Sequence, residues 1–111
     1  MTPGTRPLVV LVTAPEDSAR ELGRALVDER LAACVNVVPG VTSIYTWHGK
    51  REESTESLLV IKTRPERYAA LERRVLELHP YSVPEVLALS VETGAPAYLR
   101  WVQDSVTAEG R

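Results

Sequence analysis

The sequence has few of the residues that build disulfides, metal clusters or membrane spans. Cys34 is the single cysteine among 111 residues, so an internal disulfide is excluded and a reducing, cytoplasmic location is expected. The two histidines, His48 and His79, lack the spacing of a zinc site, and no Cys-x-x-Cys motif is present. No stretch approaches the roughly 20 apolar residues of a membrane helix. We therefore expect a soluble protein, with no membrane partner, that needs no metal for folding.

Charge and composition exclude further classes of protein. The formal net charge is -2, so no overall basic surface is available, and nucleic acid is not an expected partner. The first residues, MTPGTRP, have no apolar signal core, so secretion is not expected. A hydrophobic fraction of 44% is typical of one globular domain. We predict one domain over residues 8–106, between a disordered tail of residues 1–7 and a C-terminal tail of residues 107–111.

An internal repeat with an offset of fifty residues indicates the fold. The repeated segments are LVVLVTAPEDSARELGRAL and LLVIKTRPERYAALERRVL, each an apolar strand, a Thr-x-Pro-Glu motif and an amphipathic helix. The motif predicts that Thr13 and Thr63 cap the two helices. Strands ACVNVV and EVLALSV follow the helices, which completes strand-helix-strand twice. This order predicts an α+β fold, a ferredoxin-like sandwich with an antiparallel sheet and two helices. The segment GAPAYLRWVQDSV predicts a short third helix, with Tyr98, Trp101 and Val102 on one stripe.

Residues 35–63 predict a β-hairpin that is longer than the domain requires. Gly49 supplies the turn, and the Pro39-Gly40 pair predicts a bulge or bend in the first arm. Such an arm exposes Tyr45, Trp47 and an open strand edge unless another chain covers them. We therefore expect an oligomer built by sheet extension, with these two aromatic side chains at the interface.

Four motifs resemble those of a known family in their order and spacing: CVNVVPGVTSIYTWHGK, ESLLVIKT, HPYSVPEV and YLRW. From Leu8 to Val102 the chain is similar to the CutA family of divalent-cation tolerance proteins. The resemblance implies a small homotrimer with a ferredoxin-like subunit and a PII-like architecture. It also implies a role in tolerance to copper and other divalent metals. The implied trimer agrees with the interpretation of the long hairpin.

Two residues are candidate metal ligands. Cys34 matches the cysteine of the family's C-x-N-x-x-P-G stretch, and a thiolate is a soft ligand that suits Cu(I). The alternative is that Cys34 packs as a small buried hydrophobe. His79 is the second candidate, with a structural alternative at the C-terminal end of a helix that Pro80 terminates. Some relatives have a further cysteine at the position of Val12, so the resemblance does not extend to a multi-cysteine copper site.

Other residues are candidates for a ligand site or a subunit interface. Tyr81 and Glu85 bracket a turn and match the family's HPY-x-x-PE pattern, so they serve either the turn or a ligand. Lys62 interrupts an apolar strand, where it requires a carboxylate or an anionic ligand. Glu56 and Glu85 are the expected carboxylate partners.

No arrangement of catalytic residues is recognisable. The sequence has no Gly-rich phosphate loop and no assignable Ser/His/Asp set, so an enzyme is not expected. Two hypotheses remain. The first is a metal-response protein that binds copper or a similar divalent metal. The second is a PII-like regulatory scaffold that binds a small anionic metabolite at the subunit interface, with an unidentified protein partner.

Overall fold

The computed structural model describes residues 6–106 as one four-stranded sheet with three helices. In chain order the elements are β1 (Leu8–Ala14), α1 (Glu16–Asp28), β2 (Cys34–Trp47), β3 (Lys50–Thr63), α2 (Pro65–Leu78), β4 (Val86–Ser90) and α3 (Pro96–Ser105). Apart from residues 6 and 7, the predicted tails lie outside the described residues. No helix within the described residues is long and apolar enough to cross a membrane.

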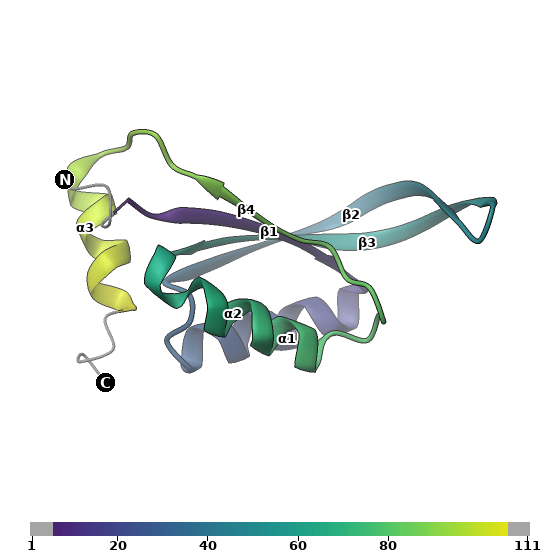
Figure 1. Cartoon of the computed structure of the whole chain (residues 1–111), viewed down its shortest axis with the longest axis horizontal. Coiled ribbons are helices and arrows are strands. Elements are labelled where there is room, and N and C mark those ends of the chain that lie inside the picture. The colour runs from purple at the N-terminus through teal and green to yellow at the C-terminus, as the bar shows by residue number, and fades with distance from the viewer. Residues whose placement is uncertain (1–5, 107–111) are drawn as a thin grey trace.

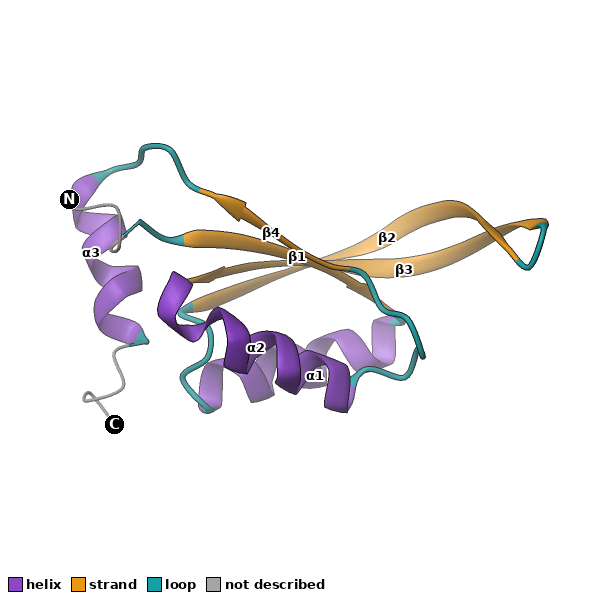
Figure 2. Ribbon diagram, in the orientation of Figure 1, coloured by secondary structure: helices purple, strands orange, loops and turns teal. Residues whose placement is uncertain are grey.

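The sheet has the strand order β2-β3-β1-β4, and every neighbouring pair is antiparallel. Helices α1 and α2 cover one face, which leaves the opposite face open (Figure 1). The third helix, α3, lies at the end of the sheet farthest from the hairpin tip (Figure 2). This arrangement confirms the predicted α+β, ferredoxin-like sandwich.

The core lies between the sheet and the two covering helices. Strand side chains alternate between faces, so every second residue of β1 and β3 points toward the helices. The core side chains are Val10, Val12, Leu59 and Ile61 from the strands, Ala19, Leu22 and Leu26 from α1, and Leu71 and Val75 from α2. Each buried Val, Leu or Ile side chain among them stabilises the fold by about 1.5–3 kcal/mol. The amphipathic helix predicted for the first repeat is therefore confirmed, with Ala19, Leu22 and Leu26 on its buried face.

The predicted threonine caps are wrong. The helices α1 and α2 begin after Pro15 and Arg64, and neither N-cap residue makes a side-chain capping bond. Thr13 and Thr63 lie within β1 and β3 instead. The hydroxyl of Thr63 donates to the carbonyl of Leu31 at 2.6 Å and is fully buried. Both threonines follow the alternation of their strands, so their side chains do not reach the helix ends.

The strands β2 and β3 form a hairpin whose outer part extends beyond the helix layer (Figure 1). The register shifts between Val38 and Val41, as Pro39-Gly40 predicts, and Gly40 has a φ of 75°. The backbone N–H of Gly40 donates to the carboxylate of Glu16 at 3.2 Å, which ties the bulge to α1. At the tip, His48 and Gly49 both have positive φ, as the tightest hairpin turns require. The predicted long hairpin is confirmed.

The predicted apolar stripe of α3 is only partly correct. Val102 is fully buried and clusters with Ala33 and Val106. Tyr98 and Trp101 are 44% and 47% exposed, because α3 packs on the end of the sheet through one residue of that stripe. Their rings lie 5.6 Å apart, so they form an exposed aromatic pair.

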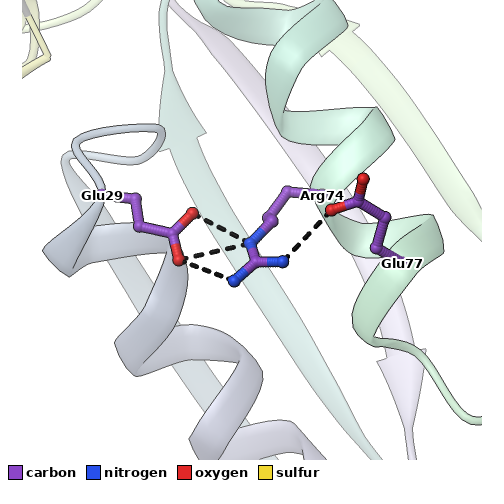
Figure 3. A network of polar contacts seen from close by, with 3 residues as sticks. All are labelled: Glu29, Arg74 and Glu77. Carbon is purple, nitrogen blue, oxygen red and sulfur yellow. Dashed lines mark hydrogen bonds and ion pairs between the residues drawn. The ribbon is translucent and has the colours of Figure 1, made fainter.

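An arginine links the two covering helices on their outer surface (Figure 3). Arg74 of α2 donates to Glu29, which follows α1, at 2.9 Å and to Glu77 at 3.1 Å. These bonds, the one to Glu29 first, raise the pKa of Arg74. All three side chains face water, which screens the charges, so the network orients the helices more than it stabilises them.

Candidate functional site

A groove of about 740 Å³ lies between the hairpin arm and the loop from α2 to β4. We call it the hairpin groove. Its lining residues are Thr13, residues 43–47, Glu56, residues 81–83 and Glu85. It therefore contains five of the candidate residues predicted from the sequence: Tyr45, Trp47, Glu56, Tyr81 and Glu85. Ser43, Ser82 and Val83 had no sequence signal, because nothing local distinguishes them from ordinary strand and loop residues, and Thr13 was predicted as a helix cap rather than as a site residue.

Glu56 and Tyr81 join the two walls of the groove. The carboxylate of Glu56 is 4% exposed and accepts a hydrogen bond from the Tyr81 hydroxyl at 2.7 Å. Burial, followed by the bond to Glu56, raises the pKa of Tyr81 to about 12. Tyr81 therefore remains a protonated donor at neutral pH, and it holds the loop against the base of the arm.

His79 orients Tyr81 from within the loop. Its Nε2 lies 2.7 Å from the carbonyl oxygen of Thr13, and its Nδ1 accepts the backbone N–H of Tyr81 at 3.1 Å. Since a carbonyl only accepts and an N–H only donates, Nε2 carries the proton and Nδ1 does not. The side chain is 7% exposed, with both nitrogens engaged by the backbone. Its role as a metal ligand stays a prediction, and such a role requires breaking one of these bonds.

A second polar group lies on the open sheet face, at the end that carries α3. Cys34 pairs with Lys62 across β2 and β3, and both are partly buried. The ammonium group of Lys62 donates to the side-chain oxygen of Asn36 and lies 3.5 Å from the carbonyl of Val60. Burial, and then the Cys34 thiol, raise the pKa of Tyr98 of α3. Asn36 and Tyr98 were missed because finding them requires the strand register and the position of α3.

The expected ion pair of Lys62 with Glu56 or Glu85 is wrong. Lys62 and Glu56 share a face of β3, but they are six residues apart, which is roughly 20 Å along a strand. Glu85 lines the hairpin groove, as Glu56 does. The partners of Lys62 are instead the uncharged oxygens of Asn36 and Val60.

The two candidate metal ligands do not come together. Cys34 pairs with Lys62 of β3, and Lys62 pairs with Val9 near the start of β1. His79 bonds to Thr13, near the other end of β1. Four residues of strand correspond to roughly 13 Å. Across residues 6–106, no group of three or more His, Cys, Asp or Glu side chains is arranged to hold a metal ion. One chain therefore does not fit a closed metal centre.

The aromatic side chains of the arm are not covered within the chain. Tyr45 and Trp47 are 44% and 46% exposed, and Ile44 on the other face is 62% exposed. The Trp47 ring meets the His48 ring edge-on at 4.9 Å. On the open face of the sheet, Val38, Leu87 and Leu89 are also exposed. This amount of exposed apolar surface is typical of an interaction surface.

Sequence relatives share most of this chain. The Protein CutA homolog of Xenopus laevis is 54% identical over 96 residues, which are 86% of this chain and 64% of that protein. The divalent-cation tolerance protein CutA of Thermus thermophilus is 51% identical over 98 residues, which are 87% of this chain and 95% of that protein. The chain thus spans less than two thirds of the frog protein but nearly the whole bacterial one.

Solved structures and a family model agree with these relatives. The solved structure of the divalent cation tolerance protein from Thermus thermophilus has a TM-score of 0.88 at 49% identity, covering 91% of this chain and 99% of that one. The crystal structure of CutA1 from Oryza sativa has a TM-score of 0.90 at 42% identity, covering 94% and 98%. The model of the CutA1 divalent ion tolerance protein matches residues 8–105. The chain belongs to the CutA1 divalent ion tolerance family.

Proposed function

We propose that this protein is a non-enzymatic, cytoplasmic homotrimer that contributes to divalent-metal tolerance by binding copper or a similar metal at Cys34. The observation that carries the proposal is the position of Cys34, a partly buried free thiol on the open face of the sheet. A thiolate is a soft ligand that selects Cu(I). Because one chain brings no further Cys or His to it among the described residues, the remaining ligands come from a neighbouring subunit.

The trimer that this proposal requires is supported by the exposed surfaces of the single chain. The sheet has two open edges, β2 and β4, and an uncovered apolar face. Pairing β2 of one chain with the sheet of the next closes every edge in a ring, whereas an open array polymerises. The open faces then turn toward one another, which brings the three copies of Cys34 nearer to each other.

A Cu(I) competition titration tests the metal proposal. We expect Cys34→Ala to weaken Cu(I) affinity at least about tenfold, or about 1.4 kcal/mol, while the molar mass in light scattering is unchanged. His48→Ala is the matched control, because His48 is an exposed potential ligand at the hairpin tip, far along β2 from Cys34. Unchanged affinity in Cys34→Ala would remove this thiol from the site.

The second candidate function is a PII-like scaffold that binds a small anionic metabolite, and Lys62 is the observation that favours it. Its ammonium group is partly buried beside uncharged oxygens, so its charge is not compensated by the groups that bond to it. An anion from solution or between subunits would compensate it. We expect phosphate to bind in a titration of the full chain and Lys62→Met to abolish that binding. Lys50→Met, on the exposed tip, should leave it unchanged.

A further inference from the structure

The charged residues that line the hairpin groove are acidic. Glu56 and Glu85 are its charged residues, and no lysine, arginine or histidine is among the described residues that line it. One oxygen of Glu56 accepts from Tyr81, which leaves the other for a ligand. Lys50 and Lys62, on the same face of β3, each lie six residues, or roughly 20 Å, from Glu56. They do not neutralise it, so the groove favours a positive charge.

Aromatic and aliphatic side chains form much of the remaining lining. The rings of Tyr45, Trp47 and Tyr81 are between 38% and 46% exposed, and Val83 is 72% exposed. Aromatic faces attract cations, most strongly when water is partly excluded. The groove therefore offers an apolar surface beside its two carboxylates, a combination that suits a ligand with both a positive charge and a carbon skeleton.

The size of the groove distinguishes an organic ligand from a metal ion. Its volume of about 740 Å³ lies within the range of roughly 300–1,000 Å³ that holds small organic molecules. A metal ion with a few waters, each about 30 Å³, fills a small part of it. Residues 6–106 also supply no set of three metal-ligating side chains there. The space and the lining both favour an organic cation.

We propose that the hairpin groove binds a small organic ammonium ion, with its charge against Glu56 and Glu85 and its carbon skeleton against Tyr45 and Val83. Tyr81 is a positioning residue, because its hydroxyl fixes the Glu56 carboxylate. This site is independent of metal binding at Cys34, which lies at the other end of the sheet. The titration therefore uses the assembled protein, in which a neighbouring chain that fills the groove would block ligand binding.

Calorimetric titration of the full chain with benzylammonium chloride at pH 7.5 tests this site. Benzyl alcohol is the neutral isostere, and we expect it to bind at least about tenfold more weakly, or about 1.4 kcal/mol. Glu56→Gln keeps an acceptor for Tyr81 and removes the charge, so its affinity for benzylammonium should fall by a similar factor. Glu85→Gln should act in the same direction. Glu53→Gln is the matched control, because Glu53 points to the opposite face of β3. This variant should bind benzylammonium with the affinity of the wild type.

Four results would overturn the proposal. Equal affinity for benzyl alcohol would show that the groove is only apolar. An equal loss of benzylammonium affinity in Glu53→Gln would show that the ligand is attracted by the general negative charge of the surface rather than by the groove. Displacement of benzylammonium by equimolar Mn²⁺ would make the groove a metal site. Absence of binding, with dissociation of the oligomer in Glu56→Gln, would show that a neighbouring chain fills the groove. Cu(I) affinity measured on Glu56→Gln should be normal, which separates this site from Cys34.

Discussion

Replacement of Tyr81 by phenylalanine removes one hydroxyl and, with it, the hydrogen bond that joins the α2–β4 loop to the hairpin arm. The donor and acceptor oxygens are 2.7 Å apart, and the accepting carboxylate of Glu56 is 4% exposed. Hydrogen bonds to charged groups contribute about 1.5–3 kcal/mol. Because Tyr81 is itself 38% exposed, water partly replaces the lost donor. We expect the free energy of unfolding at pH 7.5 to fall by about 1.5 kcal/mol.

The pH dependence gives the same prediction an independent test. The pKa of Tyr81 is about 12 in the folded chain, above the ordinary tyrosine value of 10.0, so folding favours the protonated phenol. Its contribution is complete below pH 10 and is lost as the pH rises through about 12. This difference in pKa corresponds to about 2.7 kcal/mol, and solvent screening lowers this to roughly 1 kcal/mol. Wild type should therefore lose more stability than Tyr81→Phe between about pH 9 and pH 12.

Urea denaturation followed by tryptophan fluorescence, at one fixed protein concentration, measures both effects, because oligomer stability depends on concentration. Tyr98→Phe is the matched control. It removes the same atom from a side chain of similar exposure, 44%, whose hydroxyl faces the Cys34 thiol, a weak acceptor. If Tyr81→Phe changes stability by no more than about 0.5 kcal/mol, as ordinary surface substitutions do, the bond to Glu56 contributes nothing and the reasoning is refuted.

Two further predictions concern the hairpin. Light scattering at micromolar concentration should give a trimer, and Trp47→Asp should dissociate or aggregate it, since a charge buried between chains is costly; a stable monomeric wild type would contradict this. Gly40→Ala should lower the free energy of unfolding by about 1–2 kcal/mol, because the φ of 75° is unfavourable for a residue with a Cβ although nothing lies within 4 Å of it. An unchanged denaturation midpoint would show that the bulge relaxes freely.

The elements of the fold could be predicted because their signals are local. Alternation identifies β1 and β3, and the 3.6-residue period identifies the stripe of Ala19, Leu22 and Leu26. The bulge followed from Pro39-Gly40, since proline interrupts a strand ladder wherever it occurs. The prediction of threonine caps was wrong because it depended on where each strand ends. A motif of four letters does not say where the strand ends, and both strands continue through Thr13 and Thr63.

Five of the residues that line the hairpin groove were candidates from the sequence, but their grouping could not be predicted. Glu56 and Tyr81 are 25 positions apart, and their bond forms because β1 ends opposite Ser57, so the loop before β4 reaches Glu56 of β3 past the end of β1. His79 was a candidate ligand on residue type alone. Its structural role depends on Thr13, which is 66 positions away. Because these contacts join residues so far apart in the sequence, no periodicity or motif spacing indicates them.

The wrong ion pair between Lys62 and Glu56 shows how the grouping changes the functional interpretation. In the sequence both residues lie on one strand with the same side-chain direction, six residues apart, and Glu56 is one of the two expected partners of Lys62. In the structure this part of β3 is extended, so the two side chains do not meet, and each charge is left beside uncharged partners. A cation is therefore favoured at the Glu56 end of the open face and an anion at the Lys62 end. Because roughly 20 Å far exceeds the reach of either side chain, the two ends can bind opposite charges independently.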